Sequence, residues 1–568
     1  MSPPTPEFIP MQGYTIQSLH PFVKKRIPSF FLALPTELVT SILDLLNYRA
    51  LAACSQVCKR LHVICTETIT LRYAALLAAS GMRDGPPGKL CTAERLQLLL
   101  MWHYGWADLQ WVNYFNIRCK ARGMLHTGNV VLYTGTRGSK TECLRLPSLC
   151  RKVEEKRWDL PFTLTDILAV DPSQDLIIVW SSERTETLRL IEARTLSTGE
   201  KHPRAGCGGQ YTIMPLSGPG QAGRMSAMQI HSNRIATTIR RPAQRTDAPC
   251  TIWICDWVDG STYLYIDIRQ KDHFYVPRLR FLSADTFACI SAVSPVGQDV
   301  RLCVYRLNED TSDFELHYYD LPTRLCGQHV YMRGYTFFAQ GTHNVPRTEP
   351  FYPDEDRDII IIACKLREAH SRTVYICVFA RTLLSIFNTP SSRRPRRSPW
   401  NLWRTTHRPL DRFMPPGDWN WGRKAWVIDT QYTFGDTFGH DPALVVYQPS
   451  VCGSRVALPH FADVPGRLDD LLAKPFYLLD MHPRRVYKRH LECEEMGVVP
   501  KGLVRVALRD DVPGKGERKI MGQEVELVGG SPGFTGRKVV CETDGLLVIE
   551  TNATIGDAND CTLHIYTI

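Results

Sequence analysis

Short runs of β-forming residues recur along most of this chain, and their recurrence limits the fold more than any other feature. From about Asn129 onward, runs rich in Val, Ile, Tyr and Thr alternate with clusters of Gly, Pro, Asp and Asn, without a long helical period between them. The runs come in pairs, in which an inner strand is followed by a loop and by a strand that closes on a tight turn. The pairs are 175–180 with 188–193, 234–238 with 251–257, 286–290 with 301–305, 358–363 with 373–379, and 545–549 with 562–568.

The spacing of these pairs, roughly 40 to 70 residues, is typical of the blades of an irregular β-propeller. The Gly-His and Trp-Asp signature of the regular WD repeat is absent, so the number of blades stays open. We expect the last run, 562–568, to pair with a first strand near Val130–Thr134, because this pairing would close the ring and remove the exposed edges. A β-sandwich, or two stacked sheets, is the alternative architecture.

Length and composition indicate a large globular protein. At 568 residues the chain exceeds a typical single core, and its formal net charge of +10 is modest for that length and does not by itself indicate a nucleic-acid partner. Its 19 cysteines follow no disulfide framework, which is typical of reduced thiols in an intracellular protein. No signal peptide is evident, and no apolar run reaches the ~20 residues of a membrane helix. We therefore expect a soluble protein of the cytosol or nucleus.

An N-terminal stretch, 31–65, has helical spacing instead. Leu34-Pro35 predicts an extended entry, because proline fixes its own φ and disfavours a helical conformation in the residue before it. Thr36 is a candidate N-cap for a helix that begins at Glu37, whose carboxylate suits the positive end of the helix dipole. The apolar residues of this helix follow at spacings of four and three and predict one apolar stripe: Leu38, Ile42, Leu45 and Leu46.

Two further short helices are expected in the same stretch. Residues 47–49 break the pattern, 50–55 form a second helix of small residues that carries Leu51, and a third helix is marked by Val57, Leu61 and Ile64. Together the three helices would form a compact unit.

These residues resemble the F-box pattern, in which an LPxEL entry is followed by spaced aliphatic residues and a Val-Cys-Lys/Arg-Arg ending. The matching residues are Leu34, Pro35, Glu37, Leu38, Ile42, Leu46, Leu51, Val57, Cys58, Lys59 and Arg60. The chain departs from the pattern at Leu61, where many F-boxes carry tryptophan, so a weaker last contact is expected. An ordinary helical core is the alternative interpretation, because leucine at helical spacing is most often core.

The layout of the whole chain resembles the large family of fungal, basidiomycete-type F-box proteins with irregular propeller-like C-terminal domains. Helices are expected over 69–79 and from Thr92 to about Gly105, the second opened by Glu94, and they would tie the F-box to the β domain. The fold class is therefore α+β and multidomain: a disordered leader (1–29), a three-helix F-box (30–66), a helical connector (67–124) and a large all-β, propeller-like domain (125–568).

The resemblance implies a non-catalytic function. The F-box would dock on the Skp adaptor of a cullin-RING ubiquitin ligase, and the β domain would select an unknown target protein. The residues implied in adaptor binding are Leu34, Pro35, Glu37, Leu38, Ile42, Leu46, Leu51, Val57, Cys58 and Leu61. An adaptor-bound scaffold or regulator without a role in degradation is the alternative.

Other motifs are too weak to support chemistry. Gly218 to Gly223 has the spacing of a dinucleotide fingerprint but lies in a proline-containing loop rather than between a strand and a helix. Zinc requires four converging ligands, whereas Cys54, Cys58, His62 and Cys65 fall within the expected helices and have residue types suited to their core. We find no catalytic motif, so we predict no enzyme activity, no cofactor and no metal.

One segment near 387–426 is unusual because it joins Arg393, Arg394, Arg396 and Arg397 to five tryptophans. Basic residues beside aromatic ones can bind nucleic acid or an acidic peptide. A solvated loop whose tryptophans pack on the domain is the interpretation we favour, so a nucleic-acid partner is not expected.

Overall fold

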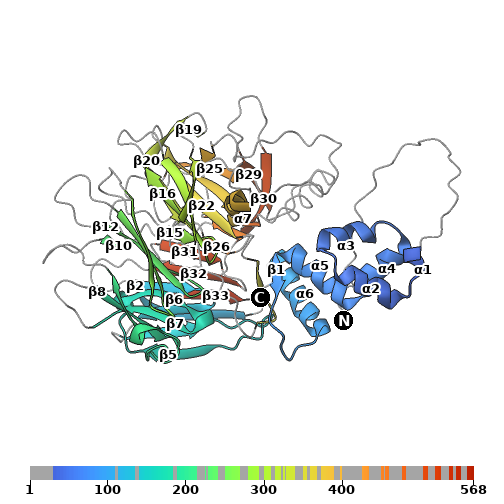
Figure 1. The fold of residues 1–568 in the computed structure, drawn as a ribbon, viewed down its shortest axis with the longest axis horizontal. Helices are drawn as coiled ribbons and strands as arrows, with labels where there is room; N and C mark the ends of the chain where they lie inside the picture. The colour runs from blue at the N-terminus through green and yellow to red at the C-terminus, as the bar shows by residue number, and fades with distance from the viewer. Residues whose placement is uncertain are drawn as a thin grey trace.

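In the computed structural model, a lobe of helices stands beside a larger body of β-sheets (Figure 1). The structure describes residues 30–108, 113–134, 140–182, 189–213, 224–225, 228–240, 250–268, 279–292, 300–308, 314–321, 324–325, 328–338, 349–354, 358–366 and 372–388, and beyond residue 388 the strands β24 to β33. The expected leader, 1–29, lies outside the described residues. No single helix of the described part is long and apolar enough to span a membrane; the neighbouring helices Lys59–Glu67 and Ile69–Ser80, bent by 80°, pass that test only as a pair.

The helical lobe holds six helices among its described residues and one short strand. They are α1 (Phe30–Ala33), α2 (Thr36–Asp44), α3 (Tyr48–Ser55), α4 (Lys59–Glu67), α5 (Ile69–Ser80), β1 (Met82–Asp84) and α6 (Thr92–Asp108). The two connector helices predicted from spacing are confirmed by α5 and α6. Gly81 ends α5 with φ 71°, a left-handed conformation that glycine adopts without strain. At α6, the Glu94 carboxylate accepts a 2.8 Å hydrogen bond from the backbone N–H of Cys91, as expected of the residue that opens the helix.

The starts of α2 and α3 differ from the predicted ones. Thr36 is the first residue of α2, and Pro35 takes the N-cap position without a side-chain bond, so the prediction of Thr36 as N-cap is wrong. The side chain of Asn47 accepts a 3.1 Å hydrogen bond from the backbone N–H of Ala50 and caps α3, which begins at Tyr48. The expected break in the pattern is therefore the cap itself, because asparagine is a favoured N-cap residue.

Successive antiparallel strands form the sheets of the β body. The first sheet runs through β2 (Asn113–Thr127), β3 (Val130–Thr134), β4 (Thr141–Arg145) and β5 (Lys156–Leu160), and the second through β6 (Ile167–Asp171), β7 (Leu176–Trp180), β8 (Arg189–Thr195) and β9 (Gln210–Ile213). The third contains β10 (Arg224–Met225), β11 (Gln229–His231), β12 (Arg234–Arg240), β13 (Cys250–Asp256) and β14 (Thr262–Ile268). The fourth contains β15 (Leu279–Phe281), β16 (Thr286–Ala292), β17 (Val300–Leu307), β18 (Phe314–Asp320) and β24 (Arg397–Ser398).

The central strands of these sheets are packed on both faces, which explains their continuous apolar sequences. In β7, Leu176 and Ile178 belong to a core cluster shared with the third sheet. The alternate residues Ile177 and Val179 belong to a cluster shared with the first sheet. β13 divides its residues in the same way between the second and fourth sheets. Because the second and third sheets are each covered by both of their neighbours in chain order, these sheets stand side by side like propeller blades and not as the two layers of a sandwich.

The two ends of the β body meet in one sheet, as predicted, but on a different strand. The last strands, β31 (Gly536–Cys541), β32 (Gly545–Thr551) and β33 (Asp560–Thr567), continue into β2, where residues 113–120 pair with β33. The predicted partner near Val130–Thr134 is β3 and pairs with the second half of β2 instead. β2 therefore begins inside the range expected to be helical connector. Its 15 residues join the two ends of the chain in one seven-stranded sheet, because its first half pairs with β33 and its second half pairs with β3.

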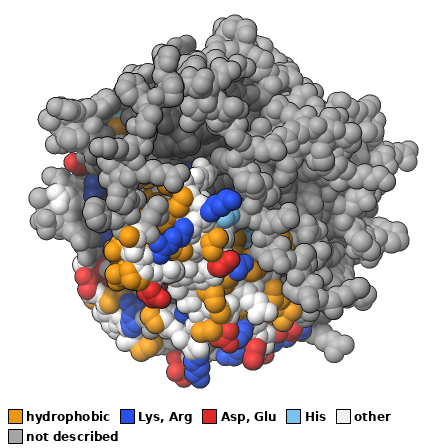
Figure 2. Space-filling model, turned by 90° about the vertical axis from the view of Figure 1, so that its right-hand side faces the viewer, with side chains coloured by type: hydrophobic (Ala, Val, Ile, Leu, Met, Phe, Trp, Pro, Cys, Tyr) orange, Lys and Arg blue, Asp and Glu red, His pale blue; other side chains and the backbone are white. Residues whose placement is uncertain are grey.

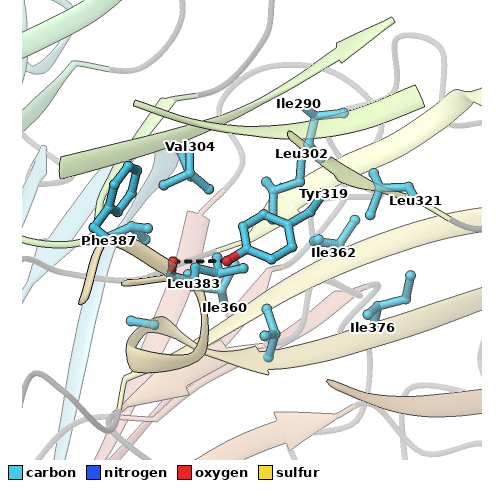
Figure 3. Packing of buried hydrophobic residues seen from close by; sticks show 14 residues of the cluster. Ile290, Leu302, Val304, Tyr319, Leu321, Ile360, Ile362, Ile376, Leu383 and Phe387 are labelled. Atoms are coloured by element: carbon cyan, nitrogen blue, oxygen red, sulfur yellow. Dashed lines mark hydrogen bonds between the residues drawn. The ribbon is translucent and has the colours of Figure 1, made fainter. Parts of the chain in front are cut away.

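The remaining strands form one extended sheet. In spatial order it runs through β19 (Arg324–Leu325), β20 (Gln328–Phe338), β22 (Ile359–Leu366), β23 (Arg372–Phe379), β25 (Ala425–Thr433), β29 (Leu503–Leu508), β30 (Arg518–Val525), β28 (Phe476–Asp480), β27 (Arg455–Leu458) and β26 (Ser450–Cys452). Figure 3 shows the core between this sheet and the fourth one, closed by α7 (Ala380–Leu384) and the 3-10 turn η5 (Ser385–Asn388). There the Tyr319 hydroxyl donates a 3.1 Å hydrogen bond to the carbonyl of Leu383.

A short strand pair joins the helical lobe to the β body. β1 pairs antiparallel with β21 (Phe351–Pro353), and the backbone N–H of Gly85 donates a 2.9 Å hydrogen bond to the carbonyl of Pro350. The Tyr73 hydroxyl of α5 and the Arg95 guanidinium of α6 each donate to the carboxylate of Asp84 at 2.7 Å. Arg95 is buried and also donates to the carbonyl of Pro86 at 2.7 Å, so both connector helices hold the strand in place.

Candidate functional site

Helix α2 has two adjacent apolar faces, and only one of them packs in the core of the lobe. Val39 and Leu43 are fully buried in the core of the helical lobe, and Leu46 packs against the same core. The residues one position earlier point away from that core: Leu38 is 52%, Ile42 39% and Leu45 86% exposed. Each set has the spacing of one helical face, so the single stripe predicted from sequence is in fact two.

Val57 adds a fourth exposed apolar side chain, 70% accessible, at the turn between α3 and α4. We call Leu38, Ile42, Leu45 and Val57 the apolar surface of the lobe. Soluble proteins expose single apolar side chains commonly, but a regular exposed stripe beside a complete core is typical of an interaction site. Figure 2, which looks onto the end of the molecule where the helices lie, shows hydrophobic side chains interspersed with charged ones.

The structure divides the ten residues predicted to bind a partner. Five are exposed: Pro35, Glu37, Leu38, Ile42 and Val57. Five belong to the core or pack against it, with Leu51 and Leu61 fully buried: Leu34, Leu46, Leu51, Cys58 and Leu61. In this conformation Leu51 and Leu61 cannot contact a partner, so their role is to hold the helices together. The expected weak contact at Leu61 is thus an internal one.

Sequence reasoning missed Val39 and Leu43, which are the true core positions of α2. It placed Leu45 in the apolar stripe but not among the partner-binding residues, although this C-cap residue of α2 carries the most exposed apolar side chain of the surface. The signal was present in the spacing, because Val39, Leu43 and Leu46 also recur at four and three. Two overlapping apolar stripes on a nine-residue helix cannot be separated by period alone.

The entry of α2 is held by a long-range hydrogen bond. Nη2 of Arg60, in the first turn of α4, donates to the backbone carbonyl of Leu34 at 2.6 Å. Leu34 packs its side chain on the core, while Pro35 after it is exposed. This contact brings the start of α2 next to the start of α4, and so joins the segment that carries Leu38 to the segment that follows Val57.

Charged side chains lie beside the apolar ones. Glu37 and Asp44 of α2 are exposed, as is Lys59 at the start of α4. The cysteines of the lobe carry no comparable chemistry: burial, and then the neighbouring Cys54, raise the pKa of the Cys65 thiol. A thiol with a raised pKa is mostly protonated and a poor nucleophile or metal ligand. Among the described residues no group of His, Cys, Asp and Glu side chains is arranged to hold a metal ion.

Two sequence features fall largely or wholly outside the described residues. They are the glycine-rich loop at 218–223 and most of the Arg- and Trp-rich segment at 387–426. Of the basic segment, the structure describes residues 387–388 of η5, the strand β24, whose two residues pair in parallel with β18, and residues 425–426 of β25.

A comparison with the curated proteins finds no match. Among solved structures, the chain is similar to the WD40 domain of SCAP from fission yeast, with 7% identity and a TM-score of 0.32 over 80% of this chain and 98% of that one. It is also similar to oligopeptidase B from Leishmania major, with 10% identity and a TM-score of 0.26 over 87% of this chain and 59% of that one. Neither score is high enough to support an argument about fold or function. Residues 31–73, which contain the apolar surface, match the family model described as F-box-like.

Proposed function

We propose that this chain is the target-recognition subunit of a Skp-cullin-F-box ubiquitin ligase. Its apolar surface would bind the Skp adaptor, and its propeller-like β body would bind the target protein. The observation that carries the proposal is the exposed stripe of α2, inside the segment that matches the F-box-like model. On this proposal the chain belongs with the fungal F-box proteins, works in the cytosol or nucleus, and performs no bond chemistry of its own.

The energetics of the surface suit a protein partner. Burying one aliphatic side chain of this size contributes on the order of 1.5 to 3 kcal/mol. Leu38 and Ile42 stand on a helix that packs on a core, so their backbone is already ordered before binding and a large share of that contribution would appear as affinity. The core beneath them, which includes Val39 and Leu43, is complete without a partner.

The junction between lobe and sheets supports a mechanism based on proximity. β1 pairs with β21, and the Tyr73 hydroxyl and the Arg95 guanidinium donate to the carbonyl of Pro350 at 3.1 and 3.4 Å, so these contacts tie the helical lobe to the β body. A subunit of this kind accelerates ubiquitin transfer by holding a target lysine near the charged conjugating enzyme, and a fixed spacing raises the effective concentration of that lysine.

The docking step can be tested with charge substitutions on the exposed stripe. We expect Leu38→Glu and Leu45→Glu each to abolish co-purification of the Skp adaptor with the full chain, because a carboxylate would be buried against an apolar partner. Leu149→Glu is the matched control, since Leu149 is 47% exposed but lies in the β body. Undiminished adaptor binding by both stripe variants would refute the docking assignment.

A second experiment separates a ligase receptor from an adaptor-bound scaffold. Cullin should be recovered with the wild-type chain and adaptor, and a protein bound to the β body should accumulate in cells that carry Leu45→Glu in place of the wild type. Recovery of adaptor and cullin with no change in the level of any bound protein would favour the scaffold.

A further inference from the structure

The carbonyl of Leu34 lies where one helix stops and the next begins. α1 ends at Ala33, and Pro35 has no N–H with which to continue a helical hydrogen-bond ladder. Carbonyl groups at the end of a helix need other donors, and for Leu34 the donor is the guanidinium of Arg60, 2.6 Å away and 26 residues along the chain. A hydrogen bond from a charged donor is stronger than a neutral one.

The first turn of α2 has no side-chain cap. Its N-cap residue, Pro35, offers no side-chain acceptor to the N–H groups of that turn, and its own carbonyl accepts from Val39 at 3.1 Å. Core packing by Leu34 and Val39 and the bond from Arg60 hold this turn against the rest of the lobe. Pro35 and Leu38, the exposed residues of the turn, move with it.

Arg60 also stands three residues after Val57 in the chain, in the first turn of the helix that Val57 precedes. Its side chain thus connects the segment that presents Leu38 with the segment that presents Val57. A surface assembled from two segments binds a rigid partner well only when the segments keep their relative position, because each misplaced contact is lost or has to be reordered on binding.

We propose that Arg60 is a positioning residue of the docking surface, which holds Pro35 and Leu38 in register with Val57 through the carbonyl of Leu34. The inference rests on the proposed adaptor-docking function. Arg60 need not touch the partner: its effect is exerted through the backbone of the α2 entry.

The test is a double-mutant cycle on the full chain, with adaptor affinity as the readout. Arg60→Met is expected to raise the Kd for the recombinant Skp adaptor at least tenfold. In the Arg60→Met background, Leu38→Ala should lose most of its effect, because Leu38 lies in the loosened turn. Leu45→Ala, two turns farther along α2, should keep its effect. Arg72→Met in α5 is the control for loss of one arginine and should leave the Kd unchanged.

A merely structural role of Arg60 makes a different prediction. Loss of folded protein would weaken all variants by the same factor, so Leu38→Ala and Leu45→Ala would keep their wild-type effects; that result, or an unchanged Kd for Arg60→Met, overturns the inference. If Leu38→Ala and Leu45→Ala have no effect even in the wild type, the proposed docking function itself fails. The two failures are therefore distinguishable.

Discussion

Trp102 of α6 packs edge-on against Phe351 of β21, with the ring centroids 6.3 Å apart and both side chains fully buried. The two residues lie in different parts of the chain, one in the helical lobe and one in the β body. Their contact, together with the pairing of β1 with β21, means that the core of the molecule continues across the junction.

Truncating this contact should destabilise the junction. We expect Phe351→Ala to cost about 3–5 kcal/mol, the usual range for a large aromatic side chain removed from a core. Tyr352→Ala is the matched control, because Tyr352 is the next residue of the same strand but is not buried in the core. Thermal unfolding and limited proteolysis at the junction provide the measurement. Equal losses of stability in the two variants would show that the contact with Trp102 does not stabilise the junction further.

A second prediction concerns the buried ion pair of Arg151 with Glu349, which lies beside the same junction. Arg151→Met leaves a buried carboxylate without its cation, so we expect a loss of about 3–5 kcal/mol. The double variant Arg151→Met with Glu349→Met removes both charges and should recover much of that loss, because a buried ion pair is often no more stabilising than apolar side chains of similar volume. Urea unfolding of the three proteins measures the difference. A double variant less stable than Arg151→Met would contradict this account.

Introducing an aspartate should affect the stability of the lobe on the buried face of α2 but not on the exposed apolar surface. Val39→Asp places a carboxylate in the core of the lobe and should unfold it, whereas Leu45→Asp, on the exposed face, should leave the thermal midpoint within about 1 °C of the wild type. Adaptor binding should be lost in both, for different reasons. Proteolytic protection of α2 to α4 in the full chain measures whether binding is lost through unfolding of the lobe or through loss of a surface contact.

Truncation from the N-terminus should be tolerated only up to the structural boundaries. A fragment that begins at residue 125 lacks the half of β2 that pairs with β33, and it also lacks β1, the partner of β21. We expect this fragment to aggregate, because it exposes unpaired strand edges and the buried ring of Phe351. A fragment that begins at residue 69 keeps α5, β1, α6 and β2 and should be monodisperse on size exclusion. A monodisperse protein from residue 125 would show that the closing strand is dispensable.

A pH-dependent loss of stability is expected from His231 in β11, whose ring stacks on Phe281 with centroids 5.6 Å apart. Burial, and then the positive charges of Arg280 and Arg234, lower the pKa of His231 to about 4, while Asp285 acts in the opposite direction. The unfolded chain binds a proton at this histidine near pH 6.5, whereas the folded chain binds it only near pH 4. The stabilising contribution is therefore complete above pH 6.5 and is lost as the pH falls toward 4.

The fall of the His231 pKa from 6.5 to about 4 corresponds to at most about 3 kcal/mol in the free energy of unfolding. His231→Phe keeps the stacking and removes the titrating group, so its urea midpoint should fall less than that of the wild type between pH 7 and pH 4.5. Identical pH profiles for the two proteins would mean that other groups cause the loss.

Much of the architecture was predictable because local pattern and burial agree. The paired strands from 175 to 379 lie close to where the apolar runs place them, since a strand packed on both faces must be apolar at every position. The connector helices α5 and α6 were predictable from local signals: Gly81 marks the end of α5, and Glu94 and the leucines on one side of the helix mark α6. The basic segment near 387–426 remains an open prediction, as most of it lies outside the described residues.

The docking site was predictable only as a segment. An F-box-like entry could be recognised from Leu34, Pro35 and the ending at Arg60, but the pattern mixes residues that build the core with residues that face outward. Leu51 and Leu61 fit the pattern because the core of the lobe needs them, whereas Leu45, the C-cap residue of α2, has the most exposed side chain of the apolar surface and stands out only once burial is known.

The amino-acid sequence alone determined that the chain has a short helical lobe with an apolar excess, followed by a long series of strands, because periods of 3.6 and 2 residues are local properties of the backbone. Only the tertiary structure decided which face of α2 is left open, that β33 closes on residues 113–120, and that β1 reaches β21 to join lobe and sheets. Each of these depends on contacts between residues far apart in the chain, and such contacts do not appear as a periodic pattern in the sequence of either segment.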